Sequence, residues 1–330
     1  MQHTPRLCID GRAASDFASR GMMAQEVIDQ LVSAQGEPNL ENEWVDRQRT
    51  VLLSHPGQIF SGQLKRFETR RKIGRSPLYW LWEKNFVKSS NISVLHRFVP
   101  ADRIGRLHQC PTITTVLPAE TNGLVRFPAP RKEGQAFVVP SEGDKKTLEK
   151  KYRIVEEQMF VVRPSVRRYV HFTQIPQATS EGLVLLLVGD RFEKTQLKKL
   201  ERIVSTRYPA LTRKKISLKN TEEFAPTRWV KTLQETKLCF YLTDASFDWP
   251  TLALESIYWG IPTIFMDGHA ALSELLPQSG LSLSRYLIEH LDFSGLALEL
   301  TKAQDALAQQ GRFEPLALAK NLREVYSLFN

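Results

Sequence analysis

One stretch of the sequence, DASFDWPTLALESIYWGIPTIFMDGHA at residues 244–270, has residue types and spacing that suit a phosphorylated ligand. Pro250 fits the first turn of a helix, because its ring fixes φ and its missing N–H is no loss there. The amides of Thr251 and Leu252 would then lack partners within the helix and could donate to a phosphate. The stretch therefore predicts an anion site at a helix N-terminus.

Glu255 is an acidic residue in this otherwise apolar helix. A carboxylate in such surroundings must reach solvent or find hydrogen-bond donors. The two hydroxyls of a ribose would supply two donors at once. An exposed glutamate on the polar edge of the helix is an equally weighted interpretation. Gly260 is expected to close the helix at its C′ position, and Pro262 prevents its continuation.

Two further segments are expected beside this helix. Gly268 and His269 lie between an apolar strand and a second helix start, where glycine allows a backbone to approach a ligand closely. Gly189 follows six apolar residues, and Arg191 and Lys194 lie two and five residues after it. Cations at the end of a strand could neutralise a diphosphate leaving group. A single histidine in a loop is more often structural than ligand-binding, and cations in a loop are more often solvated than bound to a ligand. Only the three segments together therefore indicate a nucleoside diphosphate site.

Alternating strands and helices would position these segments. A doubly wound parallel sheet binds ligands at the carboxyl ends of its strands, which is where all three segments are expected. Ser141, with Asp144 three residues later, predicts a capped helix N-terminus. In the second half, strands are predicted at 183–188, 215–218, 238–242 and 261–266, and helices at 196–208, 226–236, 250–259 and 270–276. In the first half, strands are predicted at 7–9, 50–53, 92–95, 112–116, 136–139 and 159–162, and helices at 22–32 and 78–87.

The chain is basic, with a formal charge of +9 and an isoelectric point of about 9.4. Such an excess suits nucleic acid, an anionic membrane surface or a phosphorylated substrate. The basic clusters at 65–72, 145–153 and 194–202 lack the aromatic interleaving of RNA-binding modules, and each one alone is best interpreted as a solvated face. We therefore expect no nucleic-acid partner.

The bulk composition is that of a cytoplasmic globular protein. No run of eighteen apolar residues and no secretory signal is found. Cys8, Cys110 and Cys239 lie far apart, without metal-ligand spacing, and their odd number argues against a disulfide framework.

Residues 249–255 (WPTLALE) and 260–264 (GIPTI) resemble the donor motif of the retaining GT-B glycosyltransferases that build bacterial cell-surface polysaccharides, E-G-F-G-x-P-x-x-E-A-x-x-x-G-x-P-V-I. The resemblance extends to residues 7–30, 136–168 and 313–329. It implies an α/β fold of GT-B type, with two Rossmann-like domains facing across a cleft. The implied acceptor-binding domain spans 1–165 and the nucleotide-sugar-binding domain 166–311, and a C-terminal helix at 312–330 packs back on the first domain.

The same resemblance implies a role for each candidate residue. Glu255 would hold the donor ribose, and the Thr251 and Leu252 amides would hold the diphosphate. Arg191 and Lys194 would be the basic pair of the active site, and Gly21 would lie near the acceptor. The resemblance also implies transfer with retention of configuration. Helix N-termini, together with Arg191 and Lys194, would stabilise the charge on the diphosphate, so we expect no metal ion or other cofactor.

The sequence departs from the family pattern at two positions. The first acidic residue of the motif falls on Phe247, and Asp248 stands one place later as a possible catalytic substitute. The histidine of the N-terminal domain falls on Leu117. His96 is the nearest replacement on the acceptor side, although a structural histidine with satisfied hydrogen bonds is the stronger interpretation.

These observations favour a glycosyltransferase that takes its sugar from a UDP- or GDP-linked donor. The acceptor would be a glycan or a lipid-linked molecule, met at the inner face of the plasma membrane, where the cluster at 65–72 could contact anionic lipid. A catalytically weakened GT-B protein that binds and stabilises an active transferase is the alternative, motivated by Phe247 and Leu117. A nucleic-acid-binding protein on a Rossmann scaffold has no motif to support it.

Overall fold

In the computed structural model the chain forms two compact units. Unit 1 comprises residues 1–163 and 318–330, and unit 2 comprises residues 164–317. The structure describes residues 7–11, 25–28, 50–54, 65–68, 84–101, 110–119, 134–167, 182–189, 192–207, 209–218, 221–243, 246–266, 269–275, 282–283, 321–322, 324–326 and 328–329.

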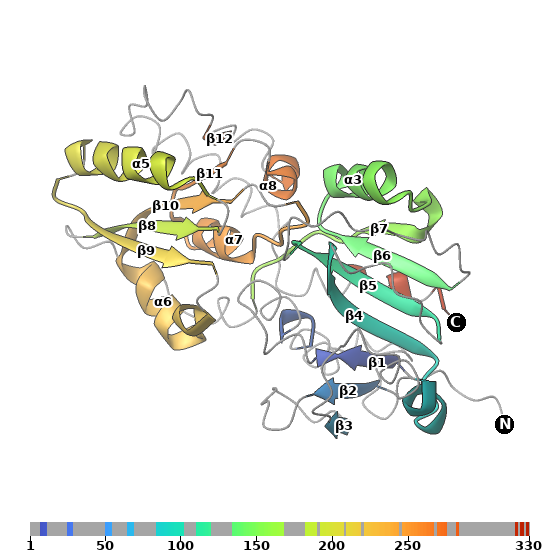
Figure 1. The fold of residues 1–330 in the computed structure, drawn as a ribbon. Helices are drawn as coiled ribbons and strands as arrows, with labels where there is room; N and C mark the ends of the chain where they lie inside the picture. The colour runs from blue at the N-terminus through green and yellow to red at the C-terminus, as the bar shows by residue number, and fades with distance from the viewer. Residues whose placement is uncertain are drawn as a thin grey trace. The chain divides into compact units, whose positions relative to one another are not determined.

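Unit 1 is built on a seven-stranded parallel sheet with the order β3-β2-β1-β4-β5-β6-β7 (Figure 1). Every described pairing in it is parallel, as the sequence predicts for a Rossmann-like domain. Its strands are β1 Leu7–Asp10, β2 Thr50–Ser54, β3 Lys65–Glu68, β4 Val94–Pro100, β5 Thr112–Leu117, β6 Gln135–Val139 and β7 Met159–Val161.

Helix α3 (Glu142–Tyr152) follows β6, and its predicted cap is confirmed. The Ser141 hydroxyl accepts a hydrogen bond from the Asp144 amide at 3.0 Å and donates to the Asp144 carboxylate at 2.6 Å. A single 3₁₀ turn, η4 (Glu156–Gln158), then leads into β7. Further helical turns occupy residues 25–28, 84–89, 321–322 and 324–326.

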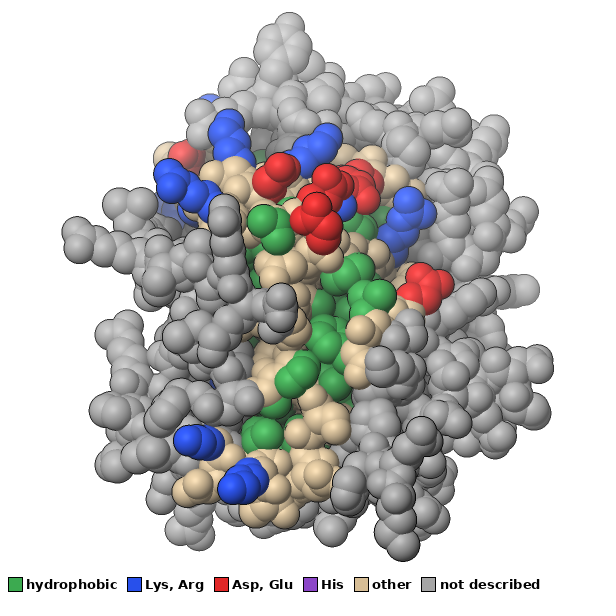
Figure 2. All heavy atoms as spheres, turned by 90° about the vertical axis from the view of Figure 1, so that its right-hand side faces the viewer, with side chains coloured by type: hydrophobic (Ala, Val, Ile, Leu, Met, Phe, Trp, Pro, Cys, Tyr) green, Lys and Arg blue, Asp and Glu red, His purple; other side chains and the backbone are tan. Residues whose placement is uncertain are grey.

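The C-terminal segment packs on unit 1, where residues 318–330 are part of the same compact body. Together with the end of β7 it borders a hollow of about 440 Å³ whose lining includes Phe160, Val162, Val325 and Leu328. Figure 2 shows this side of unit 1, with hydrophobic side chains gathered in a stripe and acidic side chains at its upper end. The resemblance to GT-B proteins predicts such a return of the C-terminal segment.

Unit 2 is built on a five-stranded parallel sheet with the order β12-β11-β10-β8-β9. Its strands are β8 Leu183–Val188, β9 Thr212–Ser217, β10 Thr236–Leu242, β11 Thr263–Met266 and β12 Ser282–Leu283. Its helices are α5 Lys194–Arg207, α6 Pro226–Glu235, α7 Thr251–Tyr258 and α8 Ala270–Leu275, with a 3₁₀ turn η5 at Thr221–Phe224.

The apolar run of β8 is buried because helices cover both faces of this sheet (Figure 1). On one face, Leu197, Leu200 and Val204 of α5 pack on Val184 and Leu186, together with alternate residues of β10. On the other face, α7 contacts β10 and β11. This is the doubly wound arrangement that the alternating sequence pattern predicts.

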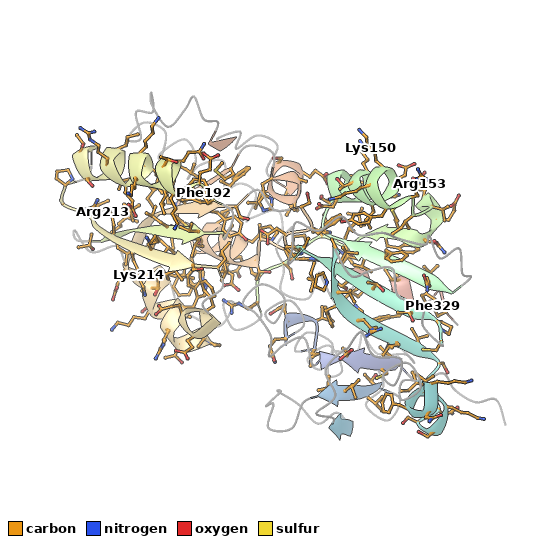
Figure 3. The ribbon with its side chains drawn as sticks, in the orientation of Figure 1. Lys150, Arg153, Phe192, Arg213, Lys214 and Phe329 are labelled. Atoms are coloured by element: carbon orange, nitrogen blue, oxygen red, sulfur yellow. The ribbon has the colours of Figure 1, made fainter. Side chains whose placement is uncertain are left out.

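The basic side chains of the clusters at 145–153 and 194–202 lie mostly on solvated surfaces, which agrees with their interpretation as solvated faces, whereas the side chains of the cluster at 65–72 lie outside the described part of the structure. Figure 3 shows Lys150 and Arg153 at the end of α3, and Arg213 and Lys214 on β9. β9 is an edge strand of its sheet, and charged side chains on such an edge oppose pairing with another chain. Lys214 also donates to Thr232 of α6 at 3.0 Å.

The described residues contain neither a candidate membrane span nor a candidate metal site. In that part of the chain, no helix is long and apolar enough to cross a bilayer, and no cluster of three His, Cys, Asp or Glu side chains is arranged to hold a metal ion. None of the three cysteines forms a disulfide, and burial raises the pKa of Cys239 to about 12.

Candidate functional site

The loops that follow β8 and β10 meet at the carboxyl edge of the unit 2 sheet. The two strands are neighbours in the sheet, and the strand order reverses between them, because β9 lies on one side of β8 and β10 lies on the other. Open α/β sheets bind ligands at such a switch point. The Gly189 amide donates to the Leu242 carbonyl at 2.9 Å. A Cβ at Gly189 would lie 2.9 Å from the Thr243 side chain, so a larger residue would push the loops apart. The Gly189 amide therefore already donates a hydrogen bond within the protein. The contact of Gly189 with the donor stays a prediction.

The loops that follow β10 and β11 are joined by Asp248 and His269. The Asp248 Oδ2 atom lies 3.0 Å from His269 Nε2 and 2.6 Å from the Tyr241 hydroxyl. Asp248 and His269 are 4% and 2% exposed, respectively. Burial, and secondly the Asp248 carboxylate, raises the pKa of Tyr241 well above its ordinary value, so the phenol donates its proton to Asp248.

His269 also caps α8. Its Nδ1 atom accepts a hydrogen bond from the Leu272 amide at 3.3 Å. Nδ1 therefore carries the lone pair, so Nε2 carries the proton that is donated to Asp248. The structure thus gives this predicted donor-binding histidine a structural role, in which both ring nitrogens have protein partners.

The N-terminus of α7 differs from its prediction in one respect. Pro250, with φ −80° and ψ 43°, is the residue before the helix and forms a tight turn in which the Thr251 amide donates to the Trp249 carbonyl at 2.8 Å. The prediction that this amide is free for a phosphate is therefore wrong in this structure. The Leu252 amide has no acceptor among the described residues and remains a candidate donor.

The C-terminus of α7 confirms its prediction. Gly260 has φ 71°, and its amide donates to the Ile257 carbonyl at 2.9 Å. The Ile261 amide donates to the Ser256 carbonyl at 2.9 Å, which completes a Schellman motif. This cap ends α7 after two turns and leads the chain into β11.

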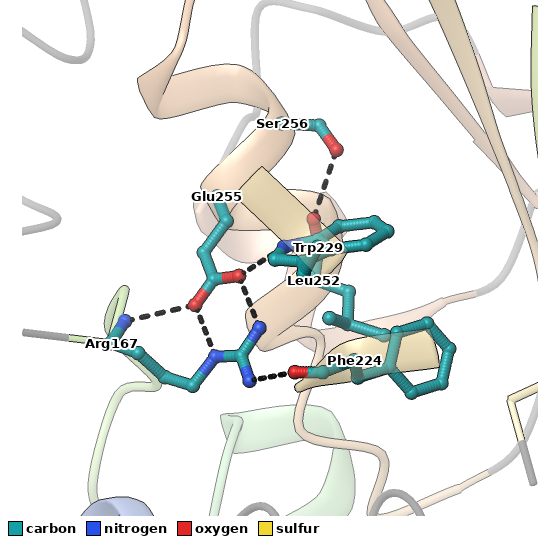
Figure 4. A network of polar contacts seen from close by, with 6 residues as sticks. All are labelled: Arg167, Phe224, Trp229, Leu252, Glu255 and Ser256. Atoms are coloured by element: carbon teal, nitrogen blue, oxygen red, sulfur yellow. Dashed lines mark hydrogen bonds and ion pairs between the residues drawn. The ribbon is translucent and has the colours of Figure 1, made fainter. Parts of the chain in front are cut away.

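Glu255 lies at the centre of a buried hydrogen-bond network (Figure 4). Its side chain is 0% exposed. Arg167 Nε lies 2.6 Å from Oε1 and Nη2 lies 2.8 Å from Oε2, so the guanidinium and the carboxylate form a forked ion pair. The Arg167 amide donates to Oε1 at 3.1 Å, and the Trp229 indole donates to Oε2 at 2.6 Å. Each carboxylate oxygen thus accepts two hydrogen bonds from the protein.

This network corrects both interpretations of Glu255 from the sequence. The side chain is not an exposed acid on a polar edge, and it does not offer a free carboxylate to ribose hydroxyls. A carboxylate has about four acceptor positions, and all of them are used. The sequence did not indicate Arg167 or Trp229 as partners of Glu255. A buried carboxylate requires hydrogen-bond donors, but the spacing of residues along the chain cannot identify a donor that lies 88 residues away.

The predicted basic pair is only partly described. Lys194 is the first residue of α5 and its side chain is exposed, five residues after Gly189. A turn in which the Phe192 amide donates to the Gly189 carbonyl at 3.2 Å leads into α5, and the Phe192 ring packs on the core beneath that helix (Figure 3). Arg191 and Gly268 lie outside the described residues. The catalytic role of Arg191 and Lys194 stays a prediction.

Of the two predicted acceptor-side residues, Gly21 and His96, the structure describes His96. Gly21 lies outside the described residues. His96 is 0% exposed, with Nδ1 2.7 Å from the Tyr326 hydroxyl and Nε2 2.8 Å from the Thr115 hydroxyl. Burial lowers the pKa of His96 to about 3. The strand was expected to end near Leu95, but β4 continues to Pro100, so His96 lies inside the sheet and is the structural histidine of the second interpretation.

Phe247, which replaces the first acidic residue of the family motif, has an unusual backbone. It has φ 62° and is buried, whereas a bulky residue rarely adopts the left-handed region. Its ring occupies the protein interior, and Asp248 follows directly in the network with Tyr241 and His269. Among the described residues, both side-chain partners of Asp248 bind its Oδ2 atom. That Asp248 takes the role of the missing acidic residue stays a prediction.

Comparison with known proteins gives matches in fold. No protein-family model matches the sequence, and no curated protein matches it. A glycosyltransferase from Rickettsia africae ESF-5 matches with a TM-score of 0.63 and 12% identity, over 99% of both chains. WaaG, a glycosyltransferase involved in lipopolysaccharide biosynthesis, also has a TM-score of 0.63 and 12% identity, over 96% of this chain and 98% of its own. The lipopolysaccharide outer core galactosyltransferase WaaB matches at 0.59 and 12%, over 98% and 99%. These full-length matches confirm the resemblance at the level of the fold: the chain has the GT-B fold of these glycosyltransferases.

Proposed function

We propose that the chain is a glycosyltransferase that takes its sugar from a UDP- or GDP-linked donor bound at the carboxyl edge of the unit 2 sheet. The observation that carries the proposal is the joining of three loops at that edge: Gly189 contacts Leu242 and Thr243, and Asp248 contacts His269. The full-length fold match to glycosyltransferases, two of them named for lipopolysaccharide synthesis, supports the same conclusion.

The chemistry follows from the groups at this edge. Breaking the bond at the anomeric carbon leaves negative charge on the diphosphate. The Leu252 amide at the N-terminus of α7 and the exposed Lys194 ammonium are suited to stabilise that charge without a metal ion. Arg191 and Asp248 would complete the reacting site, with Arg191 on the diphosphate and Asp248 toward the transferring sugar. A glycan or lipid-linked molecule is the proposed acceptor.

A nucleotide screen tests this proposal. A ligand at one hundred times its Kd adds about 2.7 kcal/mol to the free energy of unfolding, so a bound donor raises the melting temperature. We expect UDP, GDP or their sugars to do so and ADP and CMP not to. A stabilising sugar nucleotide is then incubated with the protein, and release of the free nucleotide is followed by chromatography. If none of these compounds changes the melting temperature, the proposal fails.

The second candidate is a catalytically weakened GT-B protein that stabilises an active transferase. It is supported by Phe247 and Leu117, and by the Glu255 carboxylate, whose acceptor positions are all used by the protein. Such a protein would turn over no donor by itself but would raise the turnover or the stability of a companion transferase in a mixed assay. Turnover by the purified chain alone would exclude it.

A further inference from the structure

The strand β7 (Met159–Val161) forms one edge of the unit 1 sheet, and its outer side carries hydrogen-bonding groups that the sheet does not use. The Val162 amide donates to the Val139 carbonyl of β6 at 2.9 Å, and Val161 is aligned with Val139. In this parallel pairing Phe160 and Val162 bond to β6, so the N–H and C=O groups of Val161 point away from it. The edge can therefore pair with one more strand.

The side chains of β7 do not protect this edge. Edge strands of soluble proteins commonly carry charged residues, which oppose pairing with another chain. β9, an edge strand of unit 2, follows this rule with Arg213, Lys214 and Lys215. β7 contains only Met, Phe and Val, and its residues Phe160 and Val161 are partly exposed. Of these two edges, β7 thus has the composition of a strand that another chain covers.

Exposed hydrophobic side chains gather beside β7. Val155 and Leu328, 41% and 57% exposed, are the exposed large hydrophobic residues in the described part of the chain. Val155 directly precedes η4, the turn that leads into β7. Leu328 lines the hollow of about 440 Å³ together with Phe160 and Val161, within the side of unit 1 that Figure 2 shows. Apolar side chains that gather in this way are typical of protein–protein contacts, and the hollow leaves room for side chains of a partner.

The charges at the two ends of β7 indicate which partner fits. The acidic turn η4 precedes the strand, and Arg163 follows it. Glu157 of this turn and Arg163 are both exposed, and neither has an ion-pair partner among the residues that the structure describes. When two such strands pair in antiparallel orientation, the start of one lies opposite the end of the other. Arg163 of each copy then meets the acidic turn of the other, so this edge is complementary to a second copy of the chain.

We propose that two copies of the chain form a homodimer by pairing their β7 strands in antiparallel orientation about a twofold axis. Val161 of one copy lies opposite Val161 of the other, and the two residues exchange N–H···O=C hydrogen bonds. Arg163 of each copy forms an ion pair with Glu157 of the other. The two unit 1 sheets become one continuous sheet, and the contact covers the hydrophobic side chains beside β7. This association does not depend on nucleotide binding.

The mass of the whole chain in solution is the first test. Light scattering after size-exclusion chromatography should give twice the monomer mass of 37.8 kDa, with dissociation on dilution. Val161→Pro removes the outward N–H, and proline is tolerated at an edge strand where that group makes no bond within the sheet. We expect this variant to have the monomer mass and an unchanged circular dichroism spectrum. A wild type that is monomeric at every soluble concentration, or a folded Val161→Pro variant that is still a dimer, overturns the proposal.

Charge reversal tests which surfaces meet. Glu157→Arg and Arg163→Glu each place like charges at both ends of the contact, so each variant alone should have a dimer Kd at least about tenfold higher than the wild type. Mixing the two variants should restore the dimer mass, because each copy supplies the charge that the other has lost. Glu235→Arg, at the exposed end of α6, is the matched control and should associate like the wild type.

This second test does not require that Val161→Pro folds. Failure of the mixed variants to form a dimer, or an equal weakening by Glu235→Arg, overturns the proposal.

Discussion

Asp248, in the loop after β10, accepts a hydrogen bond of 3.0 Å from His269, in the loop after β11, and this bond ties together two loops of the candidate site. The same oxygen accepts the Tyr241 hydroxyl at 2.6 Å. Both donors are buried, so the carboxylate holds them in a low-dielectric setting in which a lost bond is costly.

Replacing Asp248 by Asn should therefore weaken the connection between the loops. The amide group has one acceptor oxygen and no charge, so we expect a loss of about 1–3 kcal/mol in the free energy of unfolding. Urea denaturation followed by circular dichroism measures it. The Leu272 amide, which His269 caps, should also lose protection in hydrogen exchange. A variant as stable as the wild type would show that the Asp248–His269 bond is not formed in solution.

Glu255→Gln tests the buried ion pair independently of any ligand. Gln keeps the shape of Glu but leaves the Arg167 guanidinium without its counter-charge in the interior, and breaking a buried pair in this way costs about 3–5 kcal/mol. Chemical denaturation gives the value. The matched control is Glu235→Gln at the exposed end of α6, which should stay within about 0.5 kcal/mol of the wild type. Equal effects of the two substitutions would argue against the network.

His96 predicts a pH dependence of stability. Its pKa in the folded state is about 3, below its ordinary value of 6.5, because burial disfavours the imidazolium, although Asp10 opposes this effect. Between these values the unfolded chain binds the extra proton, so stability is complete above pH 6.5 and falls as the pH is lowered. We expect a loss of up to about 1.4 kcal/mol per pH unit from this group.

The control for this prediction is His96→Gln, which cannot titrate. Asp10 and Tyr326, the titratable neighbours of the ring, are unchanged in the variant. The difference in stability between wild type and variant should therefore shrink or reverse as the pH falls from 7 to 5. A difference that does not change with pH would mean that the ring is solvated in the folded protein.

Tyr326→Phe tests the attachment of the C-terminal segment to unit 1. The Tyr326 hydroxyl lies 2.7 Å from His96 Nδ1 in the buried interior, and removing it leaves that nitrogen unpaired. We expect a cost of about 1–3 kcal/mol and faster amide exchange at residues 324–326. Leu328→Ala, at a side chain that is 57% exposed, should have a much smaller effect. The segment would be held by other contacts if both variants behaved alike.

Local sequence signals were sufficient for much of the fold. The Ser141 cap and the Gly260 C-terminus of α7 are specified by residues within a few positions of each other, and both are confirmed. The apolar run of β8 predicted a strand buried on both faces for the same reason. These features depend on short-range geometry, which the sequence displays directly.

The candidate site was less predictable because its contacts are long-range. The motif located Glu255 but could not indicate that Arg167 and Trp229 would use all of its acceptor positions. The pattern around His96 suggested a strand end, yet β4 continues through the buried Arg97 to Pro100. In each case a polar side chain is stabilised by partners from distant segments, and no spacing rule identifies such partners.

The proposed function requires that a nucleoside diphosphate binds at the carboxyl edge of the unit 2 sheet. Hydrogen exchange of the whole protein, with and without saturating UDP or GDP, measures where the nucleotide binds. We expect protection to rise in the segments at 189–194, 246–255 and 269–272, and the amides of β9, on the outer edge of the same sheet, to stay unchanged. Protection confined to other parts of the chain, or none with either nucleotide, would contradict it.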